Sequence, residues 1–312
     1  MKTINLVEYQ NLFLKNLEQS GKSFNTVKNY RTDLNIFNNF LIQKKSDLIV
    51  KEFTAAQMRE YSHYLEAKYN SPNSIRRRVQ ALRIFFDYLI AQSAYHENPV
   101  KKILVNPKVV DLPKPCSFHI IKNLMTNLET IQKNHTGHEK LLVIRNKVLI
   151  QLIYGGCLKV SDIERLKVQH LTTSKGQVRI LVAPEKREPF TVPMPVSFTG
   201  LHQEYLSILE ERKNNNQVDF DDYLFNANPF KILKGGLSAR GIEVIFKELT
   251  KSQKTIITAK NIRQAGIFKL LVSNVPDSRI KEWMGVQPQY SLKPYKDLLE
   301  KQPDKYCYTD LA

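Results

Sequence analysis

Apolar residues recur at helical spacing through the first ninety positions of the chain. Side chains three and four residues apart share one face of an α-helix, so this repeat predicts helices that each bury one face. Two helices are expected within Val7–Leu41, separated by the turn Ser20–Thr26. A third is expected over Thr54–Lys68, with Thr54 as its cap, and a fourth over Ser74–Ala91.

A proline-rich segment follows the fourth helix and divides the chain. Pro99–Lys114 contains Pro99, Pro107 and Pro113 among lysines and valines. Proline and the residue before it favour extended backbone, so the segment predicts an extended linker. With 312 residues, the chain is long enough for two hydrophobic cores. We therefore expect a helical domain over residues 1–104, a linker over 105–115 and a second domain over 116–312.

The second half of the chain mixes helical and strand patterns. Helical spacing of apolar residues predicts further helices, and two short runs predict the strands of a small sheet. The predicted helices are Phe118–Gln132, Glu139–Tyr154, Phe198–Arg212 and Arg240–Leu249, the predicted strands are Gln177–Leu181 and Phe190–Pro193, and Lys213–Gln217 is predicted to be a loop. The expected fold class is therefore mainly α with a small β-sheet (α+β).

Basic residues outnumber acidic residues in both predicted domains. The chain has a formal net charge of +17, with 16 basic and 9 acidic residues up to residue 104 and 31 and 21 after it. This excess favours a polyanionic partner that both halves contact, such as nucleic acid. Arg76–Arg78 are expected in the first turn of the fourth helix, where the helix dipole disfavours cations. DNA phosphate is the expected nearby anion, and an ordinary solvated face is the alternative.

The cysteines and the hydropathy pattern indicate in which cellular compartment the protein is found. Cys116, Cys157 and Cys307 are too few and too scattered for a disulfide framework or a zinc site, which favours a reducing cytosol. No signal peptide and no run of about 18 or more apolar residues is recognisable. No lipidation motif or strongly amphipathic basic terminus indicates a membrane partner. We expect a soluble, cytoplasmic protein.

The stretch Thr258–Tyr295 holds the residues that helix packing explains least. Lys260 and Arg263 lie three apart, so they share a helix face and can clamp a phosphate. Tyr295 follows Arg263 by 32 residues, beyond an apolar run and a turn, and can return over this clamp. A tyrosine hydroxyl beside a clamped phosphate suits phosphoryl transfer, with the tyrosine as nucleophile. A solvated cation pair and a packing tyrosine are the alternative.

This stretch resembles the active-site signature of the tyrosine recombinases, the family of phage integrases and Xer-type chromosome resolvases. The signature is a His or Lys followed three residues later by an Arg, then a Leu-Gly-His-like turn, then a nucleophilic Tyr nine residues after that His. Here these positions read Lys260-x-x-Arg263, Met284-Gly285-Val286 and Tyr295. The spacing from Val286 to Tyr295 is nine residues.

The N-terminal half is similar to the family's core-binding domain, a small helical bundle that clamps one side of the duplex. The similarity lies in Asn25-Thr26, Tyr30-Arg31, Ser74–Arg77 and Glu97-Asn98-Pro99. We expect DNA contacts from both predicted domains. The expected DNA-binding residues are Asn25, Thr26, Lys28, Tyr30, Arg31, Arg76, Arg77, Arg78 and Arg83 in the first domain, and Arg187 and Arg240 in the second.

The resemblance also implies chemistry that uses no metal and no cofactor. Tyr295 would attack a backbone phosphate, forming a 3′-phosphotyrosyl link and a free 5′-hydroxyl, and the covalent link would conserve the bond energy for rejoining. Arg263, Lys260 and Lys159 would stabilise the charge on the phosphate. Lys186, with Arg187 as second candidate, would protonate the leaving 5′ oxygen.

Two positions depart from the family pattern. Lys159 stands where the family has an arginine, and Val286 stands where a His or Trp touches the phosphate. Losing one transition-state donor costs ~10²–10³ in rate. Gln264, where a second His is common, is a milder change, and Tyr290 is an alternative nucleophile with the wrong spacing from the turn.

Two functions therefore stay open. The first is a site-specific DNA recombinase with a divergent active site, and the second is a DNA-binding regulator or architectural partner that has lost strand cleavage. A general RNA-binding protein is a third alternative, which gives Tyr295 no role. The expected partners are duplex DNA, further copies of the chain as a dimer or tetramer on DNA, and a related recombinase. The tail Lys296–Ala312 is similar to family tails that dock on a neighbouring protomer, with disorder of its last residues as the alternative. The expected place of action is the nucleoid.

Overall fold

The computed structural model describes residues 5–50, 53–103, 112–185, 187–227, 233–251 and 257–311. The chain divides into two compact units, Met1–Asp111 and Leu112–Ala312. Each unit has its own hydrophobic core. Residues 104–111, which hold most of the predicted linker, lie outside the described ranges. The described residues are mostly helical with small antiparallel sheets, which confirms the predicted fold class.

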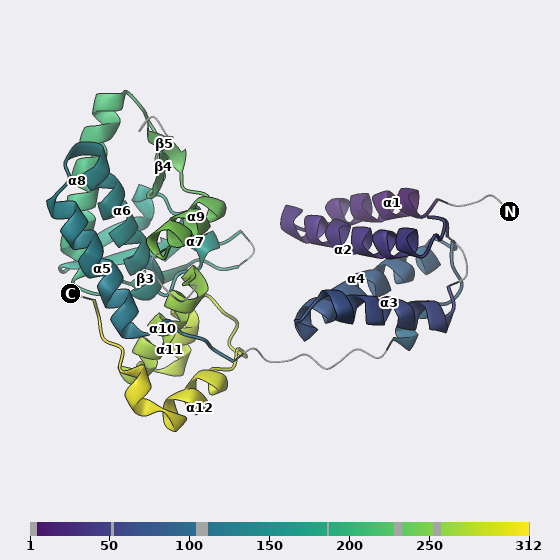
Figure 1. Ribbon diagram of the computed structural model, residues 1–312. Coiled ribbons are helices and arrows are strands. Elements are labelled where there is room, and N and C mark those ends of the chain that lie inside the picture. The colour runs from purple at the N-terminus through teal and green to yellow at the C-terminus, as the bar shows by residue number, and fades with distance from the viewer. Residues whose placement is uncertain are drawn as a thin grey trace. The chain divides into compact units, whose positions relative to one another are not determined.

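Helices build the described part of the N-terminal unit (Figure 1). They are α1 (Leu6–Gln19), α2 (Phe24–Gln43), α3 (Ala55–Lys68) and α4 (Pro72–Ala91), and all four were predicted. Each begins after a side chain that accepts a bond from a backbone N–H of the first turn. Aromatic rings fill the core: Phe37 and Tyr61 meet edge to face with centroids 5.0 Å apart.

Helix α4 begins two residues earlier than predicted. The Ser71 side chain accepts a bond from Ser74 N, and Pro72 suits the first turn because it needs no backbone N–H there. Arg76–Arg78 consequently lie in the second turn rather than the first. The influence of the helix dipole fades within one turn, so the argument for a bound phosphate from the dipole was wrong at this place.

The start of the predicted linker belongs to the N-terminal unit. Pro99–Lys102 forms a short 3-10 helix, η1, rather than extended backbone. The Asn98 carboxamide oxygen accepts a bond from Val100 N at 3.0 Å, which fixes the turn. Val100 and Ile103 are buried in the N-terminal core, and this packing overrides the extended preference of the prolines.

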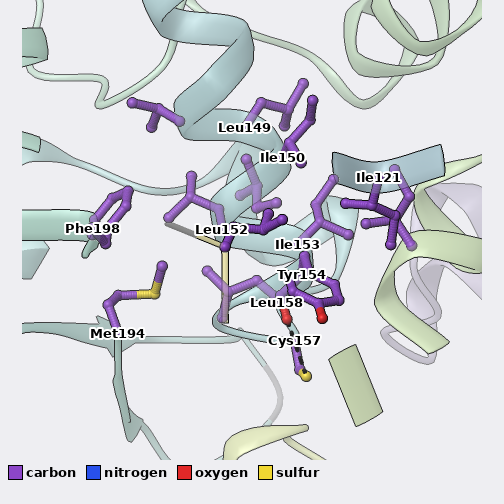
Figure 2. Close-up of a cluster of buried hydrophobic side chains, with 14 of the residues drawn as sticks. Ile121, Leu149, Ile150, Leu152, Ile153, Tyr154, Cys157, Leu158, Met194 and Phe198 are labelled. Atoms are coloured by element: carbon purple, nitrogen blue, oxygen red, sulfur yellow. Dashed lines mark hydrogen bonds between the residues drawn. The ribbon is translucent and has the colours of Figure 1, made fainter. Parts of the chain in front are cut away.

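Helix α6 (Gly137–Tyr154) lies at the centre of the C-terminal unit. Most of its residues from Leu141 onward are buried, as expected for a helix surrounded by others. It packs against α5 (Phe118–Lys133), α8 (Phe198–Asn216) and α10 (Ala259–Val272). Figure 2 shows its last turns between Ile121 of α5 and Phe198 of α8. This core holds the ends of α6 and α10 together.

The described strands form two antiparallel sheets. The first has the order β1 (Leu171–Ser174), β2 (Gln177–Val182) and β3 (Phe190–Pro193), and the second pairs β4 (Phe225–Ala227) with β5 (Leu233–Gly236). The prediction of β2 and β3 is confirmed. Strands β1 and β5 were not predicted because their polar or glycine-rich sequences carry no apolar alternation, and pairing with a neighbour makes them strands.

Two helices complete the comparison with the prediction. Helix α8 runs to Asn216 and ends at Gln217, whose φ of +51° is left-handed. The predicted loop Lys213–Gln217 was therefore wrong, since polar residues can extend an exposed helix end. Helix α9 (Ala239–Leu249) matches the predicted Arg240–Leu249 to within one residue, and the side chain of Ser238 before it accepts a bond from Gly241 N.

The C-terminal tail packs on the C-terminal unit of its own chain. It follows α11 (Asp277–Trp283) and α12 (Lys293–Lys301) and includes the 3-10 helix η3 (Pro303–Tyr306). Tyr306 stacks on Phe268 with ring centroids 4.3 Å apart, and the Tyr308 hydroxyl donates to Cys116 O at 2.8 Å. In the single chain these contacts place Tyr306 and Tyr308 on the C-terminal unit, and docking of the tail on a neighbouring protomer stays a prediction.

None of the helices that the structure describes combines the length and the apolar character needed to cross a bilayer.

Candidate active site

Tyr295 lies in the first turn of α12 and is almost completely buried. Its ring packs against Phe268 of α10, with centroids 5.4 Å apart. Burial raises the pKa of Tyr295 well above its ordinary value, and Tyr290 adds to the rise through its charge and a hydrogen bond, while Arg263 and Gln264 oppose it. At neutral pH the Tyr295 side chain is therefore a neutral phenol that lies within electrostatic reach of a guanidinium.

Arg263 connects two turns of the C-terminal unit. Its Nε donates to Cys157 O at 2.6 Å, and its Nη2 donates to Met284 O at 3.0 Å. Gly266, one turn later on α10, lets α10 approach the end of α6. This close approach allows Arg263 to contact Cys157 O. A Cβ on Gly266 would lie 2.9 Å from Cys157 Sγ and closer still to a carbonyl oxygen of α6.

Lys159 reaches the same turn from a different element. It lies directly before α7 (Val160–Glu164), and its Nζ donates to Gly285 O at 2.8 Å. The pKa of Lys159 is lowered to about 8, mainly by burial and also by the neighbouring cations Arg263 and Arg187, while Asp162 opposes the shift. The Asp162 carboxylate also accepts a bond from the backbone N of Lys159 at 3.1 Å, which fixes the backbone there.

Arg187 brings a third cation to this turn from the loop between β2 and β3. Its Nη1 donates to Gly285 O, the acceptor that Lys159 also uses. Gly285 has a φ of +56°, and the ring of Phe190 at the start of β3 packs where a Cβ would stand, 2.5 Å away. Lys186, the first candidate for the general acid, lies outside the described residues.

The remaining predicted residues of this region differ in their surroundings. Lys260 is exposed on the first turn of α10, one turn before Arg263. Val286 is partly buried against the core and offers no hydrogen-bond donor. Gln264 is buried, and its Oε1 accepts a bond from Lys114 N at 3.0 Å. Sequence reasoning missed this link because the two residues are 150 positions apart.

Metal ligands are not grouped at this site. Among the residues that the structure describes, no cluster of three or more His, Cys, Asp or Glu side chains has the arrangement of a metal site.

The N-terminal unit has a separate groove between α2 and α4, with a cavity of about 510 Å³. Polar and basic side chains from the two helices line it. They include Thr26, Asn29, Tyr30, Asp33, Asn73, Arg76, Arg77 and Gln80. Asn25, Lys28 and Arg31 are exposed on α2. Asn29 and Gln80 were not among the predicted DNA-binding residues, although their helical spacing from Thr26 and Arg77 could have shown them.

Asp33 anchors the arginines of this groove. The carboxylate is buried and accepts a bond from Arg77 Nη2 at 2.9 Å. Burial raises the pKa of Asp33 above its ordinary value, although Arg77 and Arg78 oppose the rise. Arg78 lies against Asp33 at 4.0 Å and over the Tyr69 ring at 3.7 Å, so its side chain is inside the unit. The expected role of Arg78 in direct DNA contact does not fit this burial.

Two other predicted DNA contacts lie apart from the groove residues. Arg83 is half-buried on α4, and its Nε is enclosed. Arg240 is exposed on the first turn of α9 and pairs with Glu243 at 2.7 Å. An exposed ion pair of this kind is worth little and leaves the guanidinium available to an anion.

Comparison with known proteins decides the family. Residues 118–301 match the phage integrase family, and residues 11–93 match the phage integrase N-terminal SAM-like domain. The chain belongs to the phage integrase family. The catalytic-domain match alone spans more than half of the 312 residues and includes Arg263 and Tyr295.

Relatives of this integrase-family protein include tyrosine recombinases. It is 26% identical to the tyrosine recombinase XerC of Staphylococcus saprophyticus over 230 residues, which cover 73% of this chain and 71% of that protein. It is 24% identical to a tyrosine recombinase of Agathobacter rectalis over 307 residues, covering 93% and 94% of the two chains. The relationship thus extends over both units.

Solved structures share the fold of this integrase-family protein. A lambda integrase dimer bound to a COC′ core site superimposes with a TM-score of 0.66 at 13% identity, covering 94% of this chain and 77% of that chain. XerH recombinase bound to difH substrate superimposes with a TM-score of 0.62 at 14% identity, covering 87% and 78%.

Proposed function

We propose that this protein is a site-specific DNA recombinase that cleaves and rejoins strands through a 3′-phosphotyrosyl intermediate. One observation carries the proposal: Arg263, Lys159 and Arg187 all donate to the Met284-Gly285 turn, and the buried side chain of Tyr295 lies within electrostatic reach of Arg263. A neutral phenol beside fixed cations is what an attack on a phosphodiester requires. Membership of the integrase family and the tyrosine recombinase relatives support the same reaction class.

The reaction balances without a cofactor. The Tyr295 oxygen forms a bond to phosphorus and gives up its proton to water, while the bond from phosphorus to the 5′ oxygen breaks and that oxygen takes up a proton. Arg263, Lys159 and Lys260 stabilise the negative charge of the five-coordinate phosphate. Lys186 is the proposed donor of the proton to the leaving 5′ oxygen. Attack by a 5′-hydroxyl on the phosphotyrosyl link reverses these steps and rejoins the strand.

The groove between α2 and α4 is proposed to hold the duplex on the N-terminal unit. Arg76 and Arg77 are exposed beside each other on α4, across from Thr26 and Tyr30 of α2. Such a mixture of arginines and neutral donors suits phosphate oxygens, and phosphate contacts fix the position of a protein on DNA. Assembly of two to four copies on DNA is proposed by analogy with the lambda integrase dimer and tetramer. The place of action is then the nucleoid in the cytoplasm.

Two substitutions favour a second function, a DNA-binding regulator or architectural partner that has lost strand cleavage. Val286 supplies no donor to the phosphate, and Lys159 supplies a point charge rather than a planar fork. This protein would bind the same duplex through both units and leave Tyr295 unused.

Covalent trapping separates the two functions. Nicked duplexes tiled across the genomic neighbourhood of the gene are incubated with wild type, Tyr295→Phe and Tyr290→Phe, and denaturation-resistant adducts are counted. A recombinase gives an adduct with wild type and with Tyr290→Phe but none with Tyr295→Phe. Tight binding of a duplex without any adduct supports the second function. An adduct that persists in Tyr295→Phe and is lost in Tyr290→Phe would make Tyr290 the nucleophile.

A further inference from the structure

One backbone oxygen gathers two cations from distant parts of the chain. Gly285 O accepts from Lys159 Nζ at 2.8 Å and from Arg187 Nη1. Lys159 comes from the turn before α7, and Arg187 comes from the loop between β2 and β3. Two donors on one carbonyl place the ammonium and the guanidinium side by side, next to the turn that Arg263 also contacts.

The loop that carries Arg187 contacts the rest of the C-terminal unit on both sides of this residue. Before Arg187, the Glu185 carboxylate pairs with Arg165 Nη2 at 2.8 Å, just after α7. After it, the Phe190 ring packs onto Gly285, where any side chain would collide with the ring. Arg187 lies between these two contacts in the sequence, and its own contact is with Gly285 O.

The chemistry of the three cations differs. Arg263 uses Nε and Nη2 on carbonyl oxygens of the protein. Lys159 offers a compact point charge, which cannot hold two phosphate oxygens at once in a planar fork. Arg187 has a planar guanidinium that can bind two phosphate oxygens at once. An anionic phosphate oxygen is a stronger acceptor than the carbonyl of Gly285, so a bound phosphate would replace that carbonyl as its partner.

We propose that Arg187 supplies the second guanidinium of the phosphate clamp, taking over the bidentate contact that a lysine at position 159 cannot make. The inference rests on the proposed recombinase function. It gives Arg187 a direct contact with the reacting phosphate, in place of general contact with the DNA backbone. The departure at Lys159 then leaves the active site with two guanidinium groups, one from α10 and one from the β2–β3 loop.

A rescue experiment tests the assignment. Adduct formation is followed in a single turnover at saturating nicked duplex for wild type, Arg187→Gln, Lys159→Arg and the double variant. Arg187→Gln is expected to slow the reaction by about 10²–10³. Adding Lys159→Arg restores a guanidinium beside Gly285 and is expected to recover at least about tenfold of that loss. Arg187→Gln within threefold of wild type, or a double variant no faster than Arg187→Gln, overturns the proposal.

A second readout does not require strand cleavage. Inorganic vanadate, which adopts the five-coordinate geometry of the reacting phosphate, is titrated by calorimetry into wild type, Arg187→Gln and Arg179→Gln. Arg179 is exposed on β2 of the same sheet and serves as the matched loss of one charge. Arg187→Gln is expected to weaken vanadate binding at least tenfold, and Arg179→Gln is not.

These readouts separate the two proposals. If wild type gives no adduct but Arg187→Gln weakens vanadate binding, the recombinase proposal fails and the clamp assignment holds. If vanadate does not bind wild type, or binds Arg187→Gln as tightly, the clamp assignment fails. A thermal unfolding curve for each variant tests whether the fold is retained. Recovery of the rate of adduct formation in the double variant excludes misfolding as the cause of the slower reaction of Arg187→Gln.

Discussion

The rate of strand cleavage should fall as the pH rises above neutrality, because Lys159 loses its proton. Its pKa is lowered to about 8, first by burial and then by Arg263 and Arg187. The ammonium stabilises charge on the phosphate when it is protonated. With this pKa, about nine-tenths of the protein carries the charge at pH 7 and about one-tenth at pH 9. The rate of adduct formation should therefore drop about tenfold between these two values.

The assay must report on the protein before it binds DNA. Rates measured at subsaturating duplex follow the pKa values of the free protein, whereas bound phosphate raises the pKa of an adjacent ammonium. At saturating duplex the drop should accordingly move to higher pH. Tyr295 does not ionise in this range because its pKa is raised by burial, so its ionisation cannot offset the loss.

Lys159→Arg is the matched control because a guanidinium stays charged throughout this range. Its rate should not fall between pH 7 and 9. Loss of stability cannot explain a falling rate. Between about pH 8 and the ordinary lysine pKa, Lys159 binds fewer protons in the folded state than in the unfolded state, so its contribution to the free energy of unfolding rises with pH. A rate that stays level to pH 9 in wild type, or an equal fall in Lys159→Arg, would refute the reasoning.

Three further substitutions test the packing. Gly266→Ala should lower the free energy of unfolding in urea by about 1–2 kcal/mol, because overpacking against α6 outweighs the gain in helix propensity. Asp33→Asn should weaken duplex binding in fluorescence anisotropy, because Arg77 loses the charged partner that positions it. Tyr308→Phe should cost about 1–2 kcal/mol and speed proteolysis of the tail, because a hydrogen bond that fixes the tail is lost.

Local patterns in the sequence predicted much of the fold. The spacing of apolar residues and the cap at Thr54 concern neighbours in the chain, and the helices that they mark are present. Strands β1 and β5 escaped prediction because pairing, rather than side-chain alternation, forms them. The start of α4 was misplaced because the cap at Ser71 and the proline after it were not recognised in the sequence.

Burial of neighbouring arginines was beyond the reach of the sequence. Arg77 and Arg78 are adjacent and chemically equal in the sequence. In the folded unit Arg77 lines the groove, while Arg78 lies over the Tyr69 ring inside the unit. The difference depends on the rotation of α4 against its neighbours, which one residue of register decides.

The sequence by itself determined the charge excess, the helices and the spacing of Lys260, Arg263 and Tyr295, because these are properties of short stretches. The tertiary structure decided that Lys159 and Arg187 share an acceptor, since they lie 126 and 98 residues from Gly285 and meet there after the sheet and helices have packed. A contact across such distances depends on how the whole core closes, and no local pattern of residues records that closure.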